Sequence, residues 1–289
     1  MELVRKIRRH PVCRLQKAEN GVGFLTFPGL ENTNTVRHLC TTREGGVSSG
    51  IFRSMNLSYI RGDTKENVDE NFRRVAQCLG CSADDMVCTD QTHTVNIRIA
   101  TQQDRGKGIT RERDFTDIDG LITAERGIVL AGFFADCVPL LFADPVKKVI
   151  GIAHSGWRGT VGEIGRHMVE KMQDGFGCDP ADLHAAIGPS ICQDCYEVSE
   201  DVIEIIRNRF EEAYWPHFFR EKEGAVLGKQ KKYQLDLWEL NRQILLWSKI
   251  PEDQIEVTDL CTCCNPEVLF SHRASHGKRG NLGAFITLK

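Results

Sequence analysis

Residues 128–154 read IVLAGFFADCVPLLFADPVKKVIGIAH, and they contain three short apolar runs in close succession. The runs at 128–134, 138–143 and 149–153 have the length of β-strands, and the absence of charged residues within them is typical of strands buried on both faces. No gap between the runs is long enough for a helix. Adjacent strands of this kind predict a mixed sheet, or two sheets covered by helices, and argue against a doubly wound parallel sheet.

Further strands and four helices are predicted outside this stretch. Asp63 and Glu66 form a capping-box-like pair, and the apolar positions that follow recur at helical spacing up to Gly80. A second helical stripe begins at Val161 and is expected to end at 175–177, where two glycines stand. The remaining elements are expected as strands at 95–99, 121–123, 183–187 and 255–260 and as helices at 202–210 and 237–245.

No repeat, linker or shift in composition divides the 289 residues. One domain over 1–289 is therefore expected, with residues 1–35 as an N-terminal extension or an edge element. Neither a GxGxxG segment nor a P-loop pattern is present, so the sequence gives no sign of a nucleotide-binding loop of those kinds.

The composition indicates a globular protein whose ligand is a small molecule or another protein. Apolar residues make up 41% of the chain, and the formal net charge of −3 gives no electrostatic footprint for nucleic acid or an anionic membrane. The basic residues near the start are not followed by the apolar run of a secretory signal, and the uncharged stretch at 128–135 is far shorter than the roughly 20 residues of a membrane span. We therefore expect a cytoplasmic protein whose twelve cysteines are free thiols.

Three candidate metal ligands stand where apolar runs begin or end. Cys137 follows Asp136 between two runs, His154 lies where a strand is expected to give way to a helix, and His93 precedes another run. Such junctions place side chains at the edge of a rigid scaffold, where loops carry function. The wide spacing is unlike that of a zinc finger, and an isolated histidine or cysteine beside a strand is more often packed in the core than bound to metal. The pattern alone leaves both interpretations open.

Other cysteines could suggest a second metal site: the tail cluster Cys261, Cys263 and Cys264, and the CxxC pairs at 78–81 and 192–195. Zinc ribbons use CxxC pairs that lie a short distance apart, whereas more than a hundred residues separate these two pairs. We therefore expect these cysteines to be unrelated residues of a cysteine-rich chain.

A series of motifs resembles, in the same order, the YfiH/YlmD family, which is also named after a laccase domain. The similarity covers roughly residues 41–286, and its most specific blocks are ADCVPL at 135–140 and HSGWRG at 154–159. The other blocks are TREGGVS at 42–48, SMNL at 54–57, QTH at 91–93, GPSI at 188–191, CYEV at 195–198, DLW at 236–238, CT at 261–262 and FSHR at 270–273. The resemblance implies a layered α/β/β/α sandwich with mixed sheets, which agrees with the strand-rich middle of the chain.

The resemblance also implies one zinc ion held by His93, Cys137 and His154, with copper as the less favoured metal. Three protein ligands leave a fourth position for water or substrate, as in catalytic zinc sites, where the metal lowers the pKa of a bound water to about 7. The implied reactions are phosphorolysis of purine nucleosides, including methylthioadenosine, and deamination of adenosine. For the deamination, Asp136 is a candidate proton shuttle, or alternatively a carboxylate that orients His93 or His154.

Purine nucleosides and phosphate are thus the expected partners, and phosphate needs cationic or N–H donors. Arg43 and Ser48 belong to a glycine turn whose N–H groups could bind an anion, although an ordinary turn with a solvated arginine has the same sequence pattern. Arg158 and Arg273 are second candidates, and each could equally be a structural ion-pair partner.

Three other functions remain open on the sequence. Cys137 and His154 could be the nucleophile and base of a cysteine hydrolase, although such a dyad does not need His93. A copper polyphenol oxidase would need more clustered histidines than nine scattered ones supply. The resemblance also allows a non-enzymatic role in peptidoglycan editing, with a structural zinc.

Overall fold

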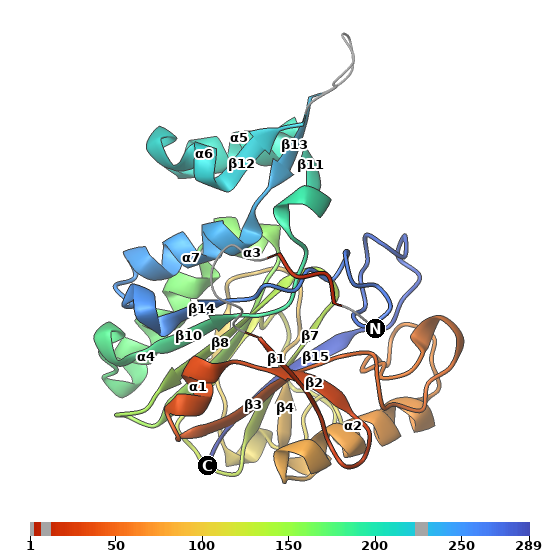
Figure 1. Cartoon of the computed structure of the whole chain (residues 1–289). Coiled ribbons are helices and arrows are strands. Elements are labelled where there is room, and N and C mark those ends of the chain that lie inside the picture. Colours follow the sequence, from red (N-terminus) through yellow and green to blue (C-terminus); the bar gives the residue numbers. More distant parts are fainter. Residues whose placement is uncertain (1–2, 7–12, 223–230) are drawn as a thin grey trace.

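The computed structural model describes residues 3–6, 13–222 and 231–289, and two six-stranded sheets form its centre (Figure 1). The first sheet has the strand order β1-β2-β3-β15-β7-β4, and the second has the order β14-β10-β8-β9-β6-β5. The strands of the first sheet are β1 (Arg14–Lys17), β2 (Gly23–Thr26), β3 (Val36–Thr41), β15 (Leu282–Leu288), β7 (Val129–Phe134) and β4 (Met86–Cys88). The strands of the second are β14 (Ile255–Val257), β10 (His184–Ile187), β8 (Val138–Asp144), β9 (Val149–Ser155), β6 (Gly120–Thr123) and β5 (Ile97–Ile99).

Both sheets are mixed. Most neighbouring strands run antiparallel, but β4 pairs with β7, β5 with β6 and β10 with β14 in parallel. The last strand in the chain, β15, lies inside the first sheet between β3 and β7. The two runs at 138–143 and 149–153 form an antiparallel hairpin at the centre of the second sheet.

Successive side chains of the central strands point to opposite faces and so belong to different layers of the apolar core. Along β8, Leu141 joins the core between the two sheets, whereas Leu140 and Phe142 join the core on the opposite face. Along β15, Ile286 faces the inter-sheet core and Phe285 faces away from it. Each central strand is therefore apolar on both faces, as the uncharged runs predicted.

Helices cover the two outer faces. The helix α2 (Lys65–Leu79) packs on the first sheet, and α4 (Ile164–Phe176) and α7 (Leu237–Trp247) pack on the second. The result is an α/β/β/α sandwich with mixed sheets, which confirms the fold expected from the sequence. The shorter helices are α1 (Pro28–Asn32), α3 (Trp157–Val161), α5 (Glu200–Arg209) and α6 (Trp215–Phe218).

A small three-stranded sheet of order β11-β13-β12 projects beyond the helices that cover the second sheet, together with α5 and α6 (Figure 1). Its strands are β11 (Glu197–Ser199), β12 (Phe219–Glu221) and β13 (Lys232–Leu235). The phenylalanines of this region belong to the same apolar core as α4 and α7. In the part of the chain that the structure describes, no helix combines the length and the apolar character needed to cross a membrane.

Three helix boundaries differ from the sequence expectation. Thr64, and not Asp63, caps α2, because its hydroxyl accepts the Asn67 N–H at 3.3 Å. The apolar stripe that begins at Val161 is shared by two helices. The first ends at Val161, the chain turns at Glu163, whose φ is 59°, and the second begins at Ile164. The second of these helices runs through Gly175 and ends at Gly177, whose left-handed backbone closes it.

The described residues of the N-terminal segment 1–35 contribute β1 at the edge of the first sheet, then β2 and α1. Residues 1–2 and 7–12 of that segment lie outside the described part of the chain. The strand predicted at 255–260 is shorter than expected, because β14 ends at Val257 and the chain leaves the sheet there.

Candidate metal centre and the pocket around it

The structure brings His93, Cys137 and His154 together from three separate elements. His93 lies in the loop that leads to β5, Cys137 in the turn between β7 and β8, and His154 near the end of β9. The ligand atoms of the three side chains all lie within 4.8 Å of one another. Val138 pairs with Ser155 and Pro139 pairs with His154 across the β8–β9 hairpin. The turn that carries Cys137 therefore lies beside the end of β9 that carries His154. Two imidazoles and a thiol are a donor set that suits zinc.

The backbone at this point is unusual in two places. His93 has a φ of 67° and Asp136 has a φ of 89°, values that residues other than glycine rarely adopt. Such conformations gather at functional sites, where the surrounding structure holds them in place. Gly156 is needed for a different reason, because a Cβ there would lie 2.6 Å from His93 Nδ1 and 3.2 Å from Cys137 Sγ. A side chain at Gly156 would therefore enter the space between the ligands.

Asp119 supports the two candidate histidine ligands, and no motif in the sequence points to it. Its buried carboxylate accepts hydrogen bonds from His154 Nδ1 at 2.7 Å and from the backbone N–H of His93 at 3.2 Å. The N–H groups of Thr92 and Thr94 donate to the same carboxylate at 3.1 and 2.8 Å. Asp119 thus fixes the His93 loop and orients the His154 ring, and it leaves Nε2 of that ring for a ligand.

The ionisation of these groups follows from their contacts. Burial lowers the pKa of His154, but Cys137 and Asp119 outweigh burial and raise it to about 9. Burial lowers the pKa of His93, and the neighbouring His154 lowers it further. Burial raises the pKa of Asp119, but hydrogen bonds, chiefly from His154, bring it below its ordinary value. The carboxylate is therefore ionised at neutral pH and can balance a cation on the imidazole side.

A pocket of about 540 Å³ opens over the three ligands, which is the size of a small-molecule site. Phe133 and Tyr196 supply aromatic surface to its lining, and Arg273 and Arg279 supply cationic groups. Arg279 is 9% exposed, and its Nε has no hydrogen-bond partner among the described residues. Burial and the nearby Arg61 lower the pKa of Arg279 to about 10, so it remains a cation at neutral pH. Neither Tyr196 nor Arg279 was a candidate in the sequence, because the CYEV block marks Tyr196 only as part of the resemblance and no quoted motif contains Arg279.

Asp136 lies in the same pocket, next to Cys137. Its Oδ1 accepts a hydrogen bond from the Thr262 hydroxyl and its Oδ2 accepts one from the backbone N–H of Arg273, both at 2.6 Å. Among the described contacts, Asp119 and not Asp136 bonds to the His154 ring and to the His93 backbone. Asp136 instead joins the Cys137 turn to two loops from the C-terminal part of the chain.

Arg43 and Ser48 lie outside the lining of this pocket. Arg43 donates through Nε to the Arg53 carbonyl at 2.9 Å and through Nη1 to the Pro266 carbonyl at 2.5 Å, and its guanidinium stacks on Phe270. The Ser48 hydroxyl accepts from Asn71 Nδ2 at 2.9 Å.

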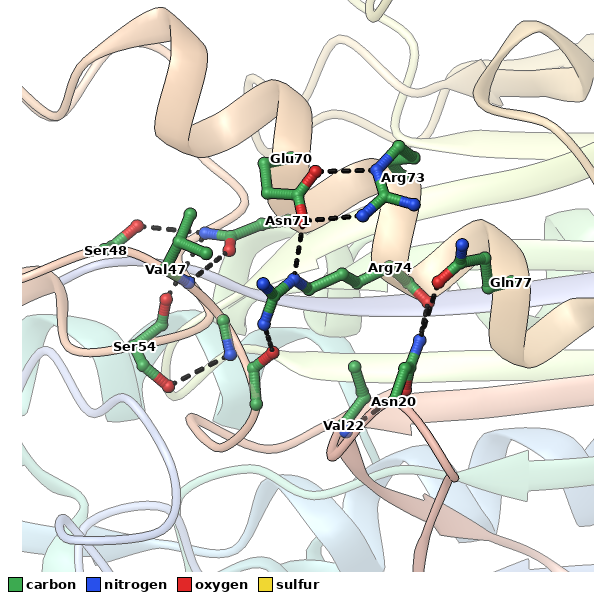
Figure 2. A network of polar contacts seen from close by, with 12 residues as sticks. Asn20, Val22, Val47, Ser48, Ser54, Glu70, Asn71, Arg73, Arg74 and Gln77 are labelled. Atoms are coloured by element: carbon green, nitrogen blue, oxygen red, sulfur yellow. Dashed lines mark hydrogen bonds and ion pairs between the residues drawn. The ribbon is translucent and has the colours of Figure 1, made fainter.

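The glycine turn that contains Arg43 and Ser48 is closed by its own hydrogen bonds (Figure 2). The N–H groups of Gly46, Val47 and Ser48 bond to Ser54 Oγ, Asn71 Oδ1 and the Ser54 carbonyl. These N–H groups have partners within the chain and do not form the anion-binding turn that the sequence suggested. The pattern corresponds to the structural alternative, a turn docked on α2.

The other two candidate arginines are used differently. Arg158 is exposed and stacks on Trp157, with its guanidinium carbon 4.4 Å from the ring centroid. Arg273 lines the pocket, and its guanidinium also donates to the carbonyls of Cys195 at 3.2 Å and Glu197 at 2.9 Å. Arg273 therefore lies at the site, whereas Arg158 does not line it.

The expectation that the other cysteines are unrelated is wrong for four of them. Cys192, Cys195, Cys261 and Cys264 form a second group whose sulfur atoms all lie within 4.8 Å of one another. The sequence offers the pair at 78–81 as the partner of the pair at 192–195, whereas the fold brings the latter pair to the tail cysteines. The pairing of parallel strands, which no local pattern reveals, is the reason.

Comparisons with known proteins show which family the chain resembles. Residues 37–289 match the family model described as multi-copper polyphenol oxidoreductase laccase. The purine nucleoside phosphorylase YlmD of Bacillus subtilis (strain 168) is 40% identical over 250 residues, which cover 86% of this chain and 87% of the relative. A protein named adenosine deaminase RL5, from an unknown prokaryotic organism, is 32% identical over 240 residues, 82% of this chain and 88% of the relative. The crystal structure of the Bacillus licheniformis hypothetical protein YfiH superposes with a TM-score of 0.86 at 37% identity, covering 95% of this chain and 99% of that one.

Proposed function

The chain belongs to the laccase-domain family that includes YfiH and YlmD, and from this premise we propose that it is a zinc-dependent purine nucleoside phosphorylase that also deaminates adenosine. We include methylthioadenosine among the nucleosides that it cleaves. The observation that carries the proposal is the convergence of His93, Cys137 and His154 at the pocket of about 540 Å³.

The donor set fits zinc on its own chemistry. Two imidazoles and one thiolate are borderline and soft ligands, and the Asp119–His154 hydrogen bond is the kind of support that zinc-bound histidines have. When bound, zinc supplies a Lewis acid that lowers the pKa of a coordinated water. His93 and His154 also approach each other with ring centroids 4.8 Å apart, which favours a shared cation between them.

The pocket wall has groups for both parts of a nucleoside and for phosphate. We assign Phe133 and Tyr196 to the purine, because both supply aromatic surface to the lining. We assign Arg279 and Arg273 to the phosphate in place of Arg43 and Ser48, because only the first pair lines the pocket. A buried guanidinium with an unpaired N–H gains a charge-assisted hydrogen bond when an anion binds.

Asp136 is the group that we propose to carry protons during deamination. It lies beside Cys137 in the pocket, and each of its oxygens already accepts one hydrogen bond within the chain. A carboxylate oxygen can accept a second one, so the side chain can receive a proton without leaving its position. The bonds from Thr262 and Arg273 hold it there.

One observation favours a second candidate, a cysteine hydrolase. Cys137, His154 and Asp119 form a nucleophile, base and orienting carboxylate, as in other cysteine enzymes. His93 has no role in that mechanism, although its backbone is held in a left-handed conformation beside the other two. Among the described residues, the three-ligand set is the one candidate metal group that contains histidine, so clustered copper sites gain no support.

The test is product analysis with adenosine, with and without inorganic phosphate. Phosphorolysis yields adenine and ribose 1-phosphate only when phosphate is present, whereas deamination yields inosine and ammonia in either case. Cys137→Ala is expected to abolish both reactions, and Cys78→Ser, which changes a thiol on the distant α2, is expected to leave both intact. Turnover of adenosine by Cys137→Ala at the parent rate would refute the mechanism. Zinc-independent hydrolysis that is lost on alkylation of Cys137 would favour the cysteine hydrolase.

A further inference from the structure

A second cluster of thiols lies outside the pocket. Its members are Cys192, Cys195, Cys261 and Cys264, which we call the four-thiol cluster, and they form two CxxC motifs. Cys192 and Cys261 are buried, whereas Cys195 and Cys264 are partly exposed. All four thiols are free. Two CxxC motifs that converge are the ligand pattern of a structural zinc site.

The second sheet brings the two motifs together. β10 and β14 are parallel neighbours, so the chain leaves both strands at the same edge of the sheet. The two departing segments continue side by side, because Ser190 and Cys261 form an isolated parallel bridge and the Thr262 N–H donates to the Ser190 carbonyl at 3.1 Å. The motifs therefore meet through backbone pairing, which fixes their relative position before any metal is considered.

The distances fit a single tetrahedral ion. Zinc–sulfur bonds of about 2.3 Å place tetrahedral sulfur ligands about 3.8 Å apart. The sulfurs here lie within 4.8 Å of one another, and those of Cys195 and Cys264 are 3.5 Å apart. The Cys192 N–H donates to Cys261 Sγ at 3.2 Å, as backbone N–H groups do when they stabilise a thiolate.

We propose that the four-thiol cluster binds one structural zinc ion, in addition to the metal at His93, Cys137 and His154. The thiols bind as thiolates and release their protons to solvent, so the site carries two negative charges. Lys6 lies next to it, with its Nζ 3.0 Å from the Asp194 carboxylate inside the first motif. Four sulfur ligands leave no position for substrate, which makes this a closed site and separates its role from that of the three-ligand site.

The position of the cluster indicates what the ion does. Tyr196, which lines the pocket, directly follows Cys195, and Arg273 donates to the Cys195 carbonyl at 3.2 Å. On the other motif, Thr262 directly follows Cys261 and donates to Asp136. A zinc ion at the cluster therefore ties the loop that carries Tyr196 to the loop whose Thr262 holds Asp136, and both Tyr196 and Asp136 line the pocket.

Metal analysis of the full-length protein, purified under reducing conditions, tests the proposal. The parent is expected to contain two zinc ions per chain, and Cys264→Ser and Cys195→Ser are each expected to contain one. His154→Ala removes a ligand of the other site and is also expected to retain one. Cys263→Ser changes the neighbouring thiol in the same loop and Cys78→Ser changes one of the distant CxxC pair, so both are expected to retain two.

X-ray absorption of the His154→Ala protein gives a second measurement that does not depend on how the cysteine variants fold. The zinc that remains is expected to have four sulfur neighbours at about 2.3 Å. A parent with one zinc that is lost in His154→Ala would overturn the proposal, as would nitrogen or oxygen ligands around the remaining ion. Iron in place of zinc, or a Cys195–Cys264 disulfide in the freshly purified protein, would overturn it as well. If Cys195→Ser and Cys264→Ser lose one zinc and still turn over nucleosides, the proposed function does not depend on this site. If the four-thiol zinc is present but the parent turns over no nucleoside, this site stands and the proposed function fails.

Discussion

The Asp119 carboxylate receives donors from both segments that carry the histidines. Three successive backbone N–H groups of the His93 loop and the His154 ring share its two oxygens. A hydrogen bond of this kind does not touch a bound ion, yet it fixes where the ligands stand. Asp119 is therefore a positioning residue, and its effect is separable from that of the ligands themselves.

Asp119→Asn is expected to weaken zinc binding at the three-ligand site by about 10- to 100-fold, because an amide cannot accept all of these hydrogen bonds or balance the charge. The measurement is zinc retention during titration with a chelator. Asp117→Asn is the matched control, since it changes an exposed carboxylate two residues away that bonds to the Thr92 hydroxyl. Equal zinc retention in the two variants would show that Asp119 does not position the ligands.

His38, far from the pocket in β3, makes folding depend on pH. It is buried, and its Nε2 accepts the Phe27 N–H at 2.8 Å, which requires a neutral ring. Burial lowers the pKa of His38 from 6.5 to about 4. Because the folded-state value is depressed, this contribution to stability is fully present above pH 6.5 and is lost as the pH falls towards 4.

The stability advantage of the parent over His38→Gln is expected to shrink by about 3 kcal/mol between pH 7 and pH 4, since the glutamine has no charge to gain. Urea unfolding at a series of pH values measures the difference. If the advantage remains constant across this range, the ring does not titrate as its contacts indicate.

The site could be predicted only in part from single residues. His93, Cys137 and His154 stand in motifs whose resemblance to a family indicated them, and the structure brings them together. Asp119 lies in no such motif, and its role depends on a strand edge meeting a distant loop. Arg43 illustrates the opposite case. A cation near two glycines suggests an anion site, but the sequence does not show whether the N–H groups of the turn already have partners within the chain.

At the scale of elements, Asn71 connects α2 to the glycine turn (Figure 2). Its buried amide donates to Ser48 Oγ and to the Ser54 and Asn56 carbonyls, and its oxygen accepts the Val47 N–H. The helix therefore holds the loop through one side chain whose hydrogen-bonding groups are all used.

Asn71→Ala is expected to lower the free energy of unfolding by about 3 kcal/mol, because it leaves several buried donors and acceptors unpaired. Gln77→Ala on the exposed face of the same helix is expected to change it by less than about 0.5 kcal/mol. Denaturant unfolding of both variants provides the comparison. Similar small losses in the two would mean that the turn has other sufficient supports.

Elements with strong periodicity were predictable, and those fixed by pairing were not. The central strands β7, β8 and β9 and the helices α2, α5 and α7 follow from apolar runs and stripes. All four residues of β1 are exposed, so no alternation marks that strand, and it exists because it pairs with β2. The interruption between α3 and α4 was hidden by a continuous stripe, although Gly162 fits there because a Cβ would lie 2.7 Å from Val95.

At the scale of the whole molecule, we propose that residues 1–289 form one domain, as the sequence suggested. All four tryptophans lie in or against the apolar core on the helical side of the second sheet, whereas the core around α2 contains none. Tryptophan fluorescence therefore reports on one side of the sandwich, and far-UV circular dichroism reports on both. The two probes are expected to give coincident urea unfolding curves. Separate midpoints would show that the layers unfold independently.

The interior position of β15 has a consequence for how the protein is made in a cell. Of the strands that the structure describes, β15 is the last that a ribosome synthesises, yet it fills the gap between β3 and β7. Until it arrives, those two strands have exposed edges that can pair with other nascent chains. The first sheet is therefore completed only after β15 has left the exit tunnel, and we expect the time before that point to be when the growing chain is most prone to aggregate.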